Sequence, residues 1–246
     1  QEADLVARKR SELLAAIPQH TVPDLIEMLI VANAVDFSPD VPEFHAPVCR
    51  LGEIADFLIP REMGGLLSGR GIVDVVNLLR EPHEVSMAGG VFIVVGCEDK
   101  ATWEVLHAKG HILNRQGSAA MIYRPSHLLG VESATTVLMA AIEGRSSGPA
   151  QTLPKLDVAG RTTKALSAGT HLDAVGHHHQ IAGVEGIMLP SCAVGGSNPI
   201  PYYLMAGHNL AKDVPAGTVI TADMIKKPTD SLLWNLRSEM DSSFGL

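Results

Sequence analysis

The sequence predicts an α+β fold: a central mixed sheet with helices on one face, followed by a small β module. Two observations lead to this fold class. Residues 89–144 alternate between apolar runs typical of strands and periodic segments typical of helices, whereas the residues beyond 151 form short apolar stretches separated by turns. A chain of 246 residues, with 46% hydrophobic and 19% charged residues, is long enough to bury the core of a globular protein.

Helices are expected at the start of the chain. Apolar residues at helical spacing predict a helix over residues 4–17, which Pro18 ends. Thr21 is the expected N-cap of a second helix, with Pro23 in its first turn. The proline-rich residues 36–48 then predict an extended loop.

The central sheet is expected to contain the clearest strand of the sequence, "GGVFIVVGC" at residues 89–97. Its continuous apolar run between glycines predicts burial on both faces. The other expected elements are a short helix over 51–58, a glycine-rich turn at 64–71, a strand over 72–79, a helix over 99–110 capped by Gly110, a strand over 119–125, and a helix over 133–144 ended by Gly144.

A small, polar segment with proline and glycine, residues 144–154, is the predicted domain boundary. We expect a helical lead-in over 1–35, an α+β domain over 36–150, a β module over 151–228 and a helical tail over 229–246. The chain begins at Gln1 as if within a helix, so the lead-in is expected to end a preceding domain of a longer polypeptide. In the tail, Trp234 is the expected anchor of an amphipathic helix on a neighbour or a second subunit.

The net charge limits the classes of binding partner, and the cysteines indicate the redox compartment. The net charge of −8, without a block of lysine and arginine, argues against nucleic acid and anionic membranes, and the longest apolar run is too short to cross a bilayer. Cys49, Cys97 and Cys192 lie far apart in the sequence, and we expect them to be buried, inert thiols of a reduced, cytoplasmic protein.

The β module contains an internal repeat. "TKALSAGTHLD", residues 163–173, aligns with "AKDVPAGTVIT", residues 211–221. Each copy is expected to form a strand, a tight turn that needs glycine, and a second strand. Two copies predict a small module with a pseudo-two-fold axis.

The repeat resembles the SAF domain, the β-clip module of sialic acid synthases, antifreeze proteins and flagellar chaperones. Together with "LGEIADFLIPREMGGLLSGRGIVD", "GGVFIVV" and "YRPSHLLGVES", it makes residues 51–225 similar to homoserine-dehydrogenase-like oxidoreductases, which include deoxyxylulose-phosphate-reductoisomerase-like enzymes. The resemblance implies a Rossmann domain, a central catalytic and dimerisation domain, and a SAF domain, of which this chain holds the last two. It also implies NAD or NADP as the cofactor, bound through a domain not present in this chain.

The dinucleotide fingerprint itself is absent from the sequence. No G-x-G-x-x-G lies between an expected strand and an expected helix, and "GGLLSGRG" lacks the spacing and precedes a strand. We therefore expect this chain alone to bind NAD(P)H poorly or not at all.

Residues 123–132, "YRPSHLLGVE", form the first candidate site because they follow a predicted strand. Arg124 offers a planar fork for a substrate carboxylate or phosphate, His127 can exchange a proton near neutral pH, and Glu132 can orient either. The structural alternative is an arginine paired with a local carboxylate and a histidine that caps the next helix.

Residues 68–74, "SGRGIVD", form the second candidate site. Ser68 and Arg70 would bind substrate, with help from backbone N–H groups that can cradle an anion. Asp74 is a catalytic candidate beside His127 and could pair with Arg124 across the sheet. Glu62 is a similar candidate, and the structural alternative is an ordinary turn with a solvated arginine.

Three consecutive histidines, residues 177–179, lie in "DAVGHHHQIAGV". In a strand, His177 and His179 would share a face, and with His171 or His208 they could form a metal site. The alternative, which we favour, is a β-clip strand whose imidazoles are flat fillers and bind no metal.

Three functions fit these patterns. The first is the catalytic and SAF portion of an NAD(P)-dependent oxidoreductase, a homo-oligomer acting on a small polar hydroxy or oxo substrate, which could be phosphorylated. The second is a non-catalytic SAF-type binding or assembly module. The third is a metal-dependent isomerase or hydrolase that uses the histidine run.

Overall fold

The computed structural model describes residues 2–127, 129–149 and 151–246, and its mixture of helices and small sheets confirms the α+β class. Gln1, at the expected join to a preceding domain, lies outside the described residues. The chain divides into two compact units. The first unit comprises Gln1–Gln19 and His45–Ala150, and the second comprises His20–Phe44 and Gln151–Leu246.

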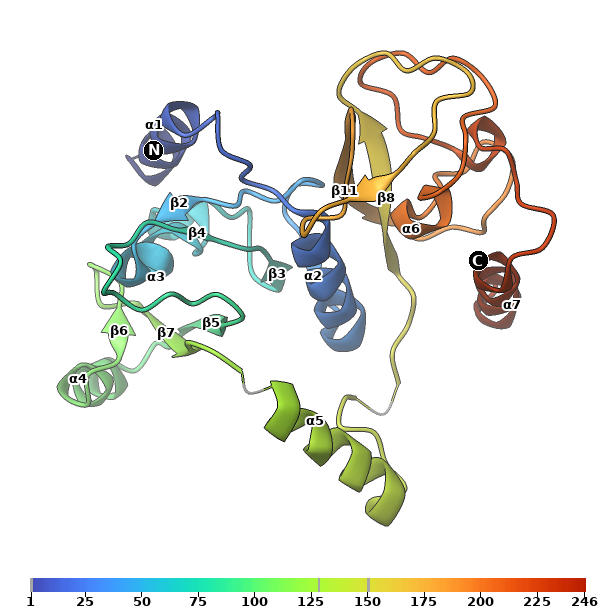
Figure 1. Cartoon of the computed structure of the whole chain (residues 1–246). Helices are drawn as coiled ribbons and strands as arrows, with labels where there is room; N and C mark the ends of the chain where they lie inside the picture. Colours follow the sequence, from blue (N-terminus) through green and yellow to red (C-terminus); the bar gives the residue numbers. More distant parts are fainter. Residues whose placement is uncertain (1, 128, 150) are drawn as a thin grey trace. The chain divides into compact units, whose positions relative to one another are not determined.

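The first unit is built around a three-stranded antiparallel sheet in the order β5–β7–β6, and it also holds a parallel pair, β2 and β4 (Figure 1). Its helices and strands are α1 (Glu2–Leu13), β2 (Val48–Cys49), the 3-10 helix η1 (Leu51–Glu53), α3 (Ile54–Phe57), the 3-10 helix η2 (Arg61–Met63), β3 (Ile72–Val73), β4 (Asn77–Leu78), β5 (Val91–Gly96), α4 (Lys100–Ala108), β6 (Ile112–Leu113), β7 (Ala119–Arg124), α5 (Leu129–Leu138) and the π-helix η3 (Met139–Glu143).

The two faces of this sheet differ. Residues paired across β5 and β7 share a face, so Phe92 and Val94 lie on the side of the buried Met121 and pack against the core of the first unit. Val91 and Ile93 point to the other side, where they are 58% and 52% exposed. The expectation that residues 89–97 are buried on both faces is therefore wrong for β5 within the described chain.

The expected strand over 72–79 is divided into β3 and β4. Asp74 interrupts it, because its carboxylate turns inward and accepts hydrogen bonds from the backbone of a neighbouring segment. A carboxylate that satisfies backbone donors in this way stops the regular alternation of a strand.

The helix caps follow the sequence closely. The Thr21 hydroxyl accepts from the Asp24 backbone N–H at the start of α2, and Pro23 lies in its first turn, as predicted. Asp99 caps α4 in the same way. Gly144, at φ +63°, ends the helical segment after η3.

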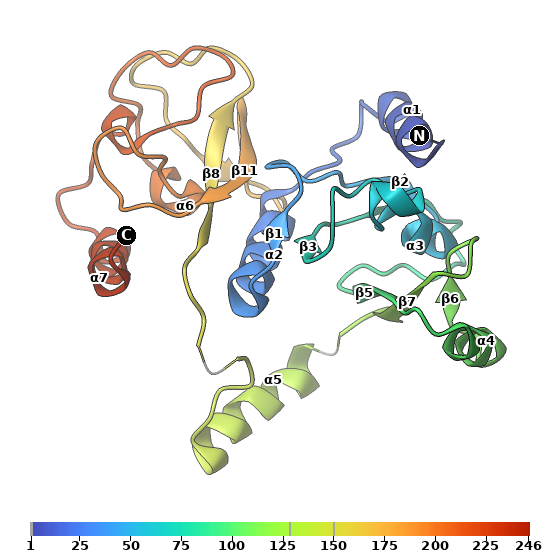
Figure 2. The same cartoon turned by 180° about the vertical axis from the view of Figure 1, so that it is seen from behind.

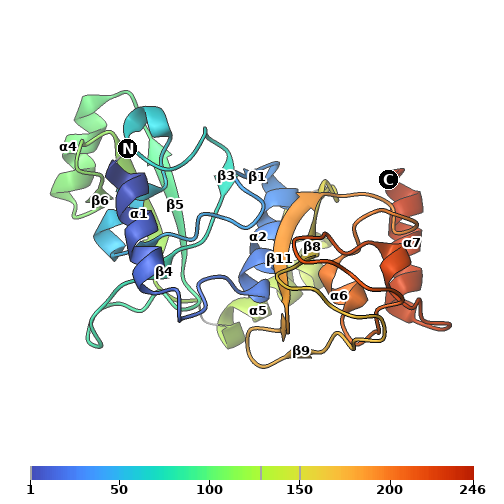
Figure 3. The same ribbon diagram turned by 90° about the horizontal axis from the view of Figure 1, so that it is seen from above.

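The second unit is built on a seven-residue antiparallel ladder between β8 and β11 (Figure 3). Helix α2 joins it through Asn33, whose amide Oδ1 accepts from the Leu156 N–H at 3.0 Å and whose Nδ2 donates to the Leu156 carbonyl at 3.1 Å. The helices and strands of this unit are α2 (Val22–Val35), β1 (Ser38–Pro39), β8 (Leu156–Thr162), β9 (Ala174–Val175), β10 (Gln180–Ile181), β11 (Val184–Pro190), α6 (Tyr202–Met205), the 3-10 helix η4 (Ala222–Met224) and α7 (Leu232–Phe244).

The two repeats pair with each other about a pseudo-two-fold axis. Leu166 and Val214 occupy corresponding positions and exchange both backbone hydrogen bonds, at 2.9 and 2.8 Å. Other bonds obey the same symmetry: the Gly169 N–H donates to the Leu210 carbonyl, as the corresponding Gly217 N–H donates to Thr162. The sequence repeat therefore corresponds to a real internal symmetry of the second unit.

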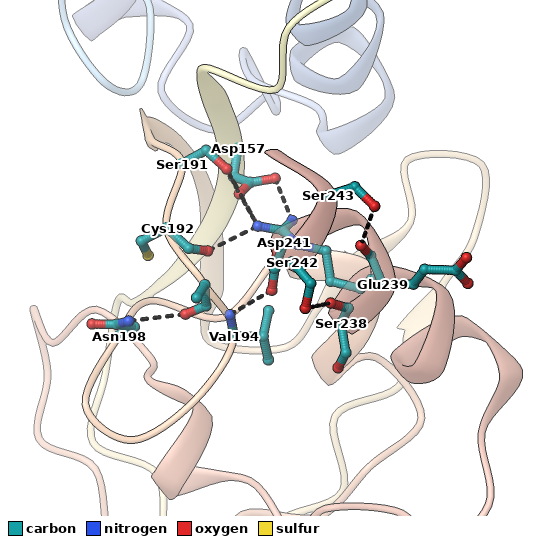
Figure 4. Close-up of polar contacts among 12 residues, drawn as sticks. Asp157, Ser191, Cys192, Val194, Asn198, Ser238, Glu239, Asp241, Ser242 and Ser243 are labelled. Carbon is teal, nitrogen blue, oxygen red and sulfur yellow. Dashed lines mark hydrogen bonds and ion pairs between the residues drawn. The ribbon is translucent and has the colours of Figure 1, made fainter. Parts of the chain in front are cut away.

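Helix α7 is fixed to the second unit. The Trp234 indole is buried and donates to the Leu204 carbonyl at 3.1 Å. The Arg237 guanidinium donates to both carboxylate oxygens of Asp157 at 2.7 Å and to Asp241 at 2.5 Å. Figure 4 shows the carboxylates of Asp157 and Asp241 on either side of the guanidinium, and the Cys192 carbonyl accepts a further hydrogen bond from it.

Candidate functional site

The end of β7 presents two of the expected site residues. Strands β5 and β7 lie side by side (Figure 2). Arg124 is the last residue of β7 and pairs with Val91, the first residue of β5. Three residues later, the His127 backbone N–H donates to the Gly89 carbonyl at 3.2 Å. The loop after β7 is therefore held against the turn that leads into β5.

That turn has an unusual backbone. Met87 and Gly89 have φ values of +55° and +71°, and the Gly90 N–H donates to the Met87 carbonyl at 2.7 Å. A Cβ atom on Gly90 would lie 2.7 Å from the Pro125 carbonyl oxygen. Only a residue without a side chain allows the two backbones to approach this closely.

Glu132 lies beside Arg124. A carboxylate oxygen of Glu132, in the first turn of α5, is 2.5 Å from the Arg124 guanidinium, and the side chains are 36% and 60% exposed. An ion pair this exposed contributes little to stability. Arg124 can therefore exchange contacts with Glu132 for contacts with an anionic ligand at little energetic cost. The structure thus pairs Arg124 with Glu132, and His127 follows three residues after Arg124 in the loop that contacts Gly89.

Asp74 has a different environment from the one expected. It is buried, and its carboxylate accepts from three backbone N–H groups, those of His45 at 3.0 Å, Ala46 at 2.9 Å and Val75 at 2.8 Å. Burial raises the pKa of Asp74, and the three amide donors oppose this shift. In place of the expected pairing between Asp74 and Arg124, the carboxylate holds the backbone at residues 45–46, and Arg124 pairs with Glu132.

Ser68 and Arg70 are exposed in the glycine-rich loop that joins Leu67 to β3. Glu62 lies in η2, before this loop, and is also exposed. The loop runs into a two-residue strand, whereas a pyrophosphate cradle requires glycines that open a helix. This loop therefore does not fit a dinucleotide.

The histidine run forms a turn, and the expectation of a strand there is wrong. Residues 177–179 connect β9 to β10, with Gly176 and His179 at φ +69° and +48°. The His179 Nδ1 atom is 2.6 Å from the Tyr203 hydroxyl. His171 contacts Asn209 and Asp173. Among the described residues, no three histidine, cysteine or acidic side chains are grouped closely enough to hold a metal ion.

The three thiols differ in their surroundings. Burial raises the pKa of Cys49 to about 12, which makes it inert, and burial also raises the pKa of the half-buried Cys192. Cys97, after β5, is exposed, so the expectation of burial is wrong for this residue.

Residues 19–133 match the family model for the oxidoreductase DRL catalytic domain. The match supports an oxidoreductase catalytic domain, and it contains the candidate residues of both sites: Glu62, Ser68, Arg70, Asp74, Arg124, His127 and Glu132. No curated protein matches the chain. None of the described helices is long and apolar enough to cross a membrane.

Sequence reasoning missed two features of the site. One is the link between Asp74 and residues 45–46, which lie almost thirty positions earlier and show no shared motif. The other is the turn at 87–90, although the paired glycines in "MAGG" are the kind of sequence that such a turn requires.

Proposed function

We propose that the chain carries the catalytic portion of an NAD(P)-dependent oxidoreductase that resembles homoserine dehydrogenase. Its substrate is a small polar hydroxy or oxo compound with an anionic group, which can be a phosphate. The observation that carries this proposal is the match of residues 19–133 to an oxidoreductase catalytic domain.

In this proposal Arg124 binds the anionic end of the substrate. Its exposed guanidinium lies at the end of β7 and presents a planar fork of donors. Glu132 orients the fork in the absence of substrate. Ser68 and Arg70 supply further polar contacts to the substrate from their exposed loop.

His127 is the proposed proton donor and acceptor, because an imidazole can give and take a proton near neutral pH. Asp74 contributes indirectly. Its carboxylate fixes the backbone at His45 and Ala46, and we assign it a positioning role in place of proton transfer.

The nicotinamide cofactor, NAD or NADP, would supply or accept the hydride. The glycine-rich loop at 64–71 does not fit it, so we propose that a domain outside this chain binds it. The second unit is the proposed SAF module, which its pseudo-two-fold pairing supports. We further propose that the protein is a cytoplasmic homo-oligomer.

Two titrations test the proposal. In the first, NADPH and NADH are added to the 246-residue chain in a calorimeter. We expect no binding, and micromolar binding would overturn the placement of the cofactor on another domain.

In the second titration, inorganic phosphate is followed by ³¹P NMR with the unmodified chain, Arg124→Ala and Arg145→Ala. Arg145 is a matched control, because it is 63% exposed and also paired with a glutamate, Glu143. We expect only Arg124→Ala to lose phosphate binding. Equal loss in both variants, or no binding by the unmodified chain, would contradict the anion-binding role of Arg124.

A further inference from the structure

The Gly89 turn contacts His127 at two points. The Gly89 carbonyl accepts the His127 backbone N–H, and the imidazole edge lies over the Gly89 Cα atom. A Cβ atom built on Gly89 would be 2.9 Å from His127 Nε2 and 3.0 Å from Cδ2. These separations are shorter than the sum of the van der Waals radii, so the imidazole and a side chain at position 89 cannot keep these places together.

Gly90, the next residue, is required for a different reason. A Cβ atom there would lie 2.7 Å from the Pro125 carbonyl oxygen and 2.9 Å from the carbonyl oxygens of Arg124 and Met87. These are backbone atoms, so a side chain at Gly90 would force the two chain segments apart. At Gly89, among the residues that the structure describes, the heavy atoms within 4 Å of such a Cβ belong to the His127 ring, which can rotate away. A side chain at Gly89 therefore acts on the position of one imidazole.

We infer that Gly89 is a positioning residue for His127: its carbonyl group holds the His127 backbone, and its missing side chain leaves the space that the imidazole occupies. This inference rests on the proposed function for its catalytic meaning. The contact between Gly89 and the imidazole does not depend on the proposed function. The ring turns its Nε2–Cδ2 edge toward Gly89, so Nδ1 lies on the opposite side of the ring.

The test compares Gly89→Ala with Gly110→Ala. Both glycines have positive φ, +71° and +80°, so both alanines impose a similar backbone strain. The two positions differ in their neighbours, since no heavy atom of the described part of the chain lies within 4 Å of a Cβ at Gly110. We expect the His127 imidazole resonances, assigned by their loss in His127→Ala, to move in Gly89→Ala and to stay in place in Gly110→Ala. Unchanged resonances in Gly89→Ala, or equal changes in both variants, would overturn the inference.

A double-mutant comparison of melting temperatures separates the clash with His127 from a general loss of stability. Removing the imidazole removes the clash, so Gly89→Ala should lower the melting temperature less in a His127→Ala background than in the unmodified chain. In that background its effect should equal that of Gly110→Ala. If Gly89→Ala lowers the melting temperature equally in both backgrounds, or the double variant alone fails to fold, the imidazole is not what Gly89 accommodates.

The activity of the intact oxidoreductase separates the positioning of His127 by Gly89 from the proposed catalytic role of His127. A displacement of about 1 Å in a group that transfers protons lowers kcat by roughly 100-fold, with a smaller effect on KM. If Gly89→Ala moves the imidazole but leaves kcat unchanged, the role of His127 in catalysis fails while the contact with Gly89 stands. If the resonances do not move, the positioning inference fails whatever happens to kcat.

Discussion

Asp74 is a buried carboxylate whose hydrogen bonds go to backbone N–H groups. The segment that it holds contains Ala46 at φ +41°, a conformation that costs free energy for any residue with a Cβ. Ala46 is itself buried, so its N–H has no access to water. The carboxylate offsets the strain because it satisfies donors that would otherwise be buried without partners.

We predict that Asp74→Ala destabilises the protein by about 2–4 kcal/mol, because it leaves the buried Ala46 N–H and the partly buried N–H groups of His45 and Val75 without their acceptor. Asp74→Asn should cost less, since its amide oxygen can still accept from Ala46 and Val75. Urea unfolding measures both, with the exposed Asp4→Ala as control. A cost below about 1 kcal/mol for Asp74→Ala would show that these bonds are not needed.

A second prediction at the residue scale concerns Glu53 and the dependence of stability on pH. Its hydrogen bonds with the Arg10 guanidinium, at 2.7 and 3.0 Å, lower the pKa of Glu53. The folded state therefore binds this proton more weakly than the unfolded chain does. The stabilisation is present above the unfolded pKa and is lost as the pH falls through the folded pKa.

Glu53→Gln should therefore lower the melting temperature at neutral pH and have a smaller effect in acid. Melting curves between about pH 7 and about pH 3 span the ordinary titration of glutamate. The exposed Glu104→Gln is the control. A deficit in Glu53→Gln that stays constant across this range would contradict the prediction.

Some residues of the candidate site could be predicted from the sequence, and others could not. Arg124, His127 and Glu132 lie within ten positions after an apolar run, so local reasoning could group them, and the structure shows the ion pair between Arg124 and Glu132. The environment of Asp74 depends on a loop that is close in space and distant in sequence. No periodicity or motif carries that information.

Among the elements, the helices were easier to predict than the strands. Thr21 and Asp99 cap α2 and α4 with local contacts of two or three residues, which the sequence displays directly. Strand β5 shows the opposite case. Its uninterrupted apolar run predicts two buried faces, yet Val91 and Ile93 are exposed, because a strand's surroundings depend on partners distant in sequence.

The repeat in the second unit makes a prediction at the scale of elements. Gly169 and Gly217 occupy corresponding turns at φ +83° and +75°, and a Cβ at either would have no heavy atom of residues 2–127, 129–149 or 151–246 within 4 Å. Alanine at each position should cost roughly 1–2 kcal/mol, the strain of the left-handed conformation alone. The two costs should be similar because the N–H groups of both glycines donate to corresponding carbonyls, those of Leu210 and Thr162.

Thermal unfolding of the two variants tests this prediction. Gly195→Ala is the control, since Gly195 also has open space around it but is not at positive φ. It should cost little. A difference of more than about 1 kcal/mol between Gly169→Ala and Gly217→Ala, comparable with the strain itself, would mean that the symmetry does not extend to the energetics of the turns.

For the whole molecule, the division into units could be predicted only in part. The composition change near residues 144–154 marks where the chain passes into the second unit. Helix α2 belongs to that unit as well, because Asn33 bonds to β8 more than a hundred positions later. The sequence shows no sign of such a long-range contact, so it predicts the lead-in over 1–35 as one segment.

The last prediction concerns assembly. The outer face of the β5–β7–β6 sheet presents Val91, Ile93 and Ile122, which are 58%, 52% and 47% exposed, and β5 lies at the edge of the sheet. An apolar face next to a strand at the sheet edge favours association between chains. Association removes the apolar side chains from water, and the edge strand can form backbone hydrogen bonds with another chain. The proposed homo-oligomer would cover this face.

Light scattering with size-exclusion chromatography measures the effect of Ile93→Asp on the molecular mass. We expect the unmodified chain to be larger than a monomer and Ile93→Asp to shift it toward the monomer, because a carboxylate cannot be buried unpaired. Val105→Asp is the matched control: Val105 is 54% exposed, almost as much as Ile93, but lies on α4. If both variants keep the mass of the unmodified chain, the outer sheet face is not an oligomer interface. If both become monomers, added charge alone causes the dissociation, so only a selective effect of Ile93→Asp assigns the interface to the sheet.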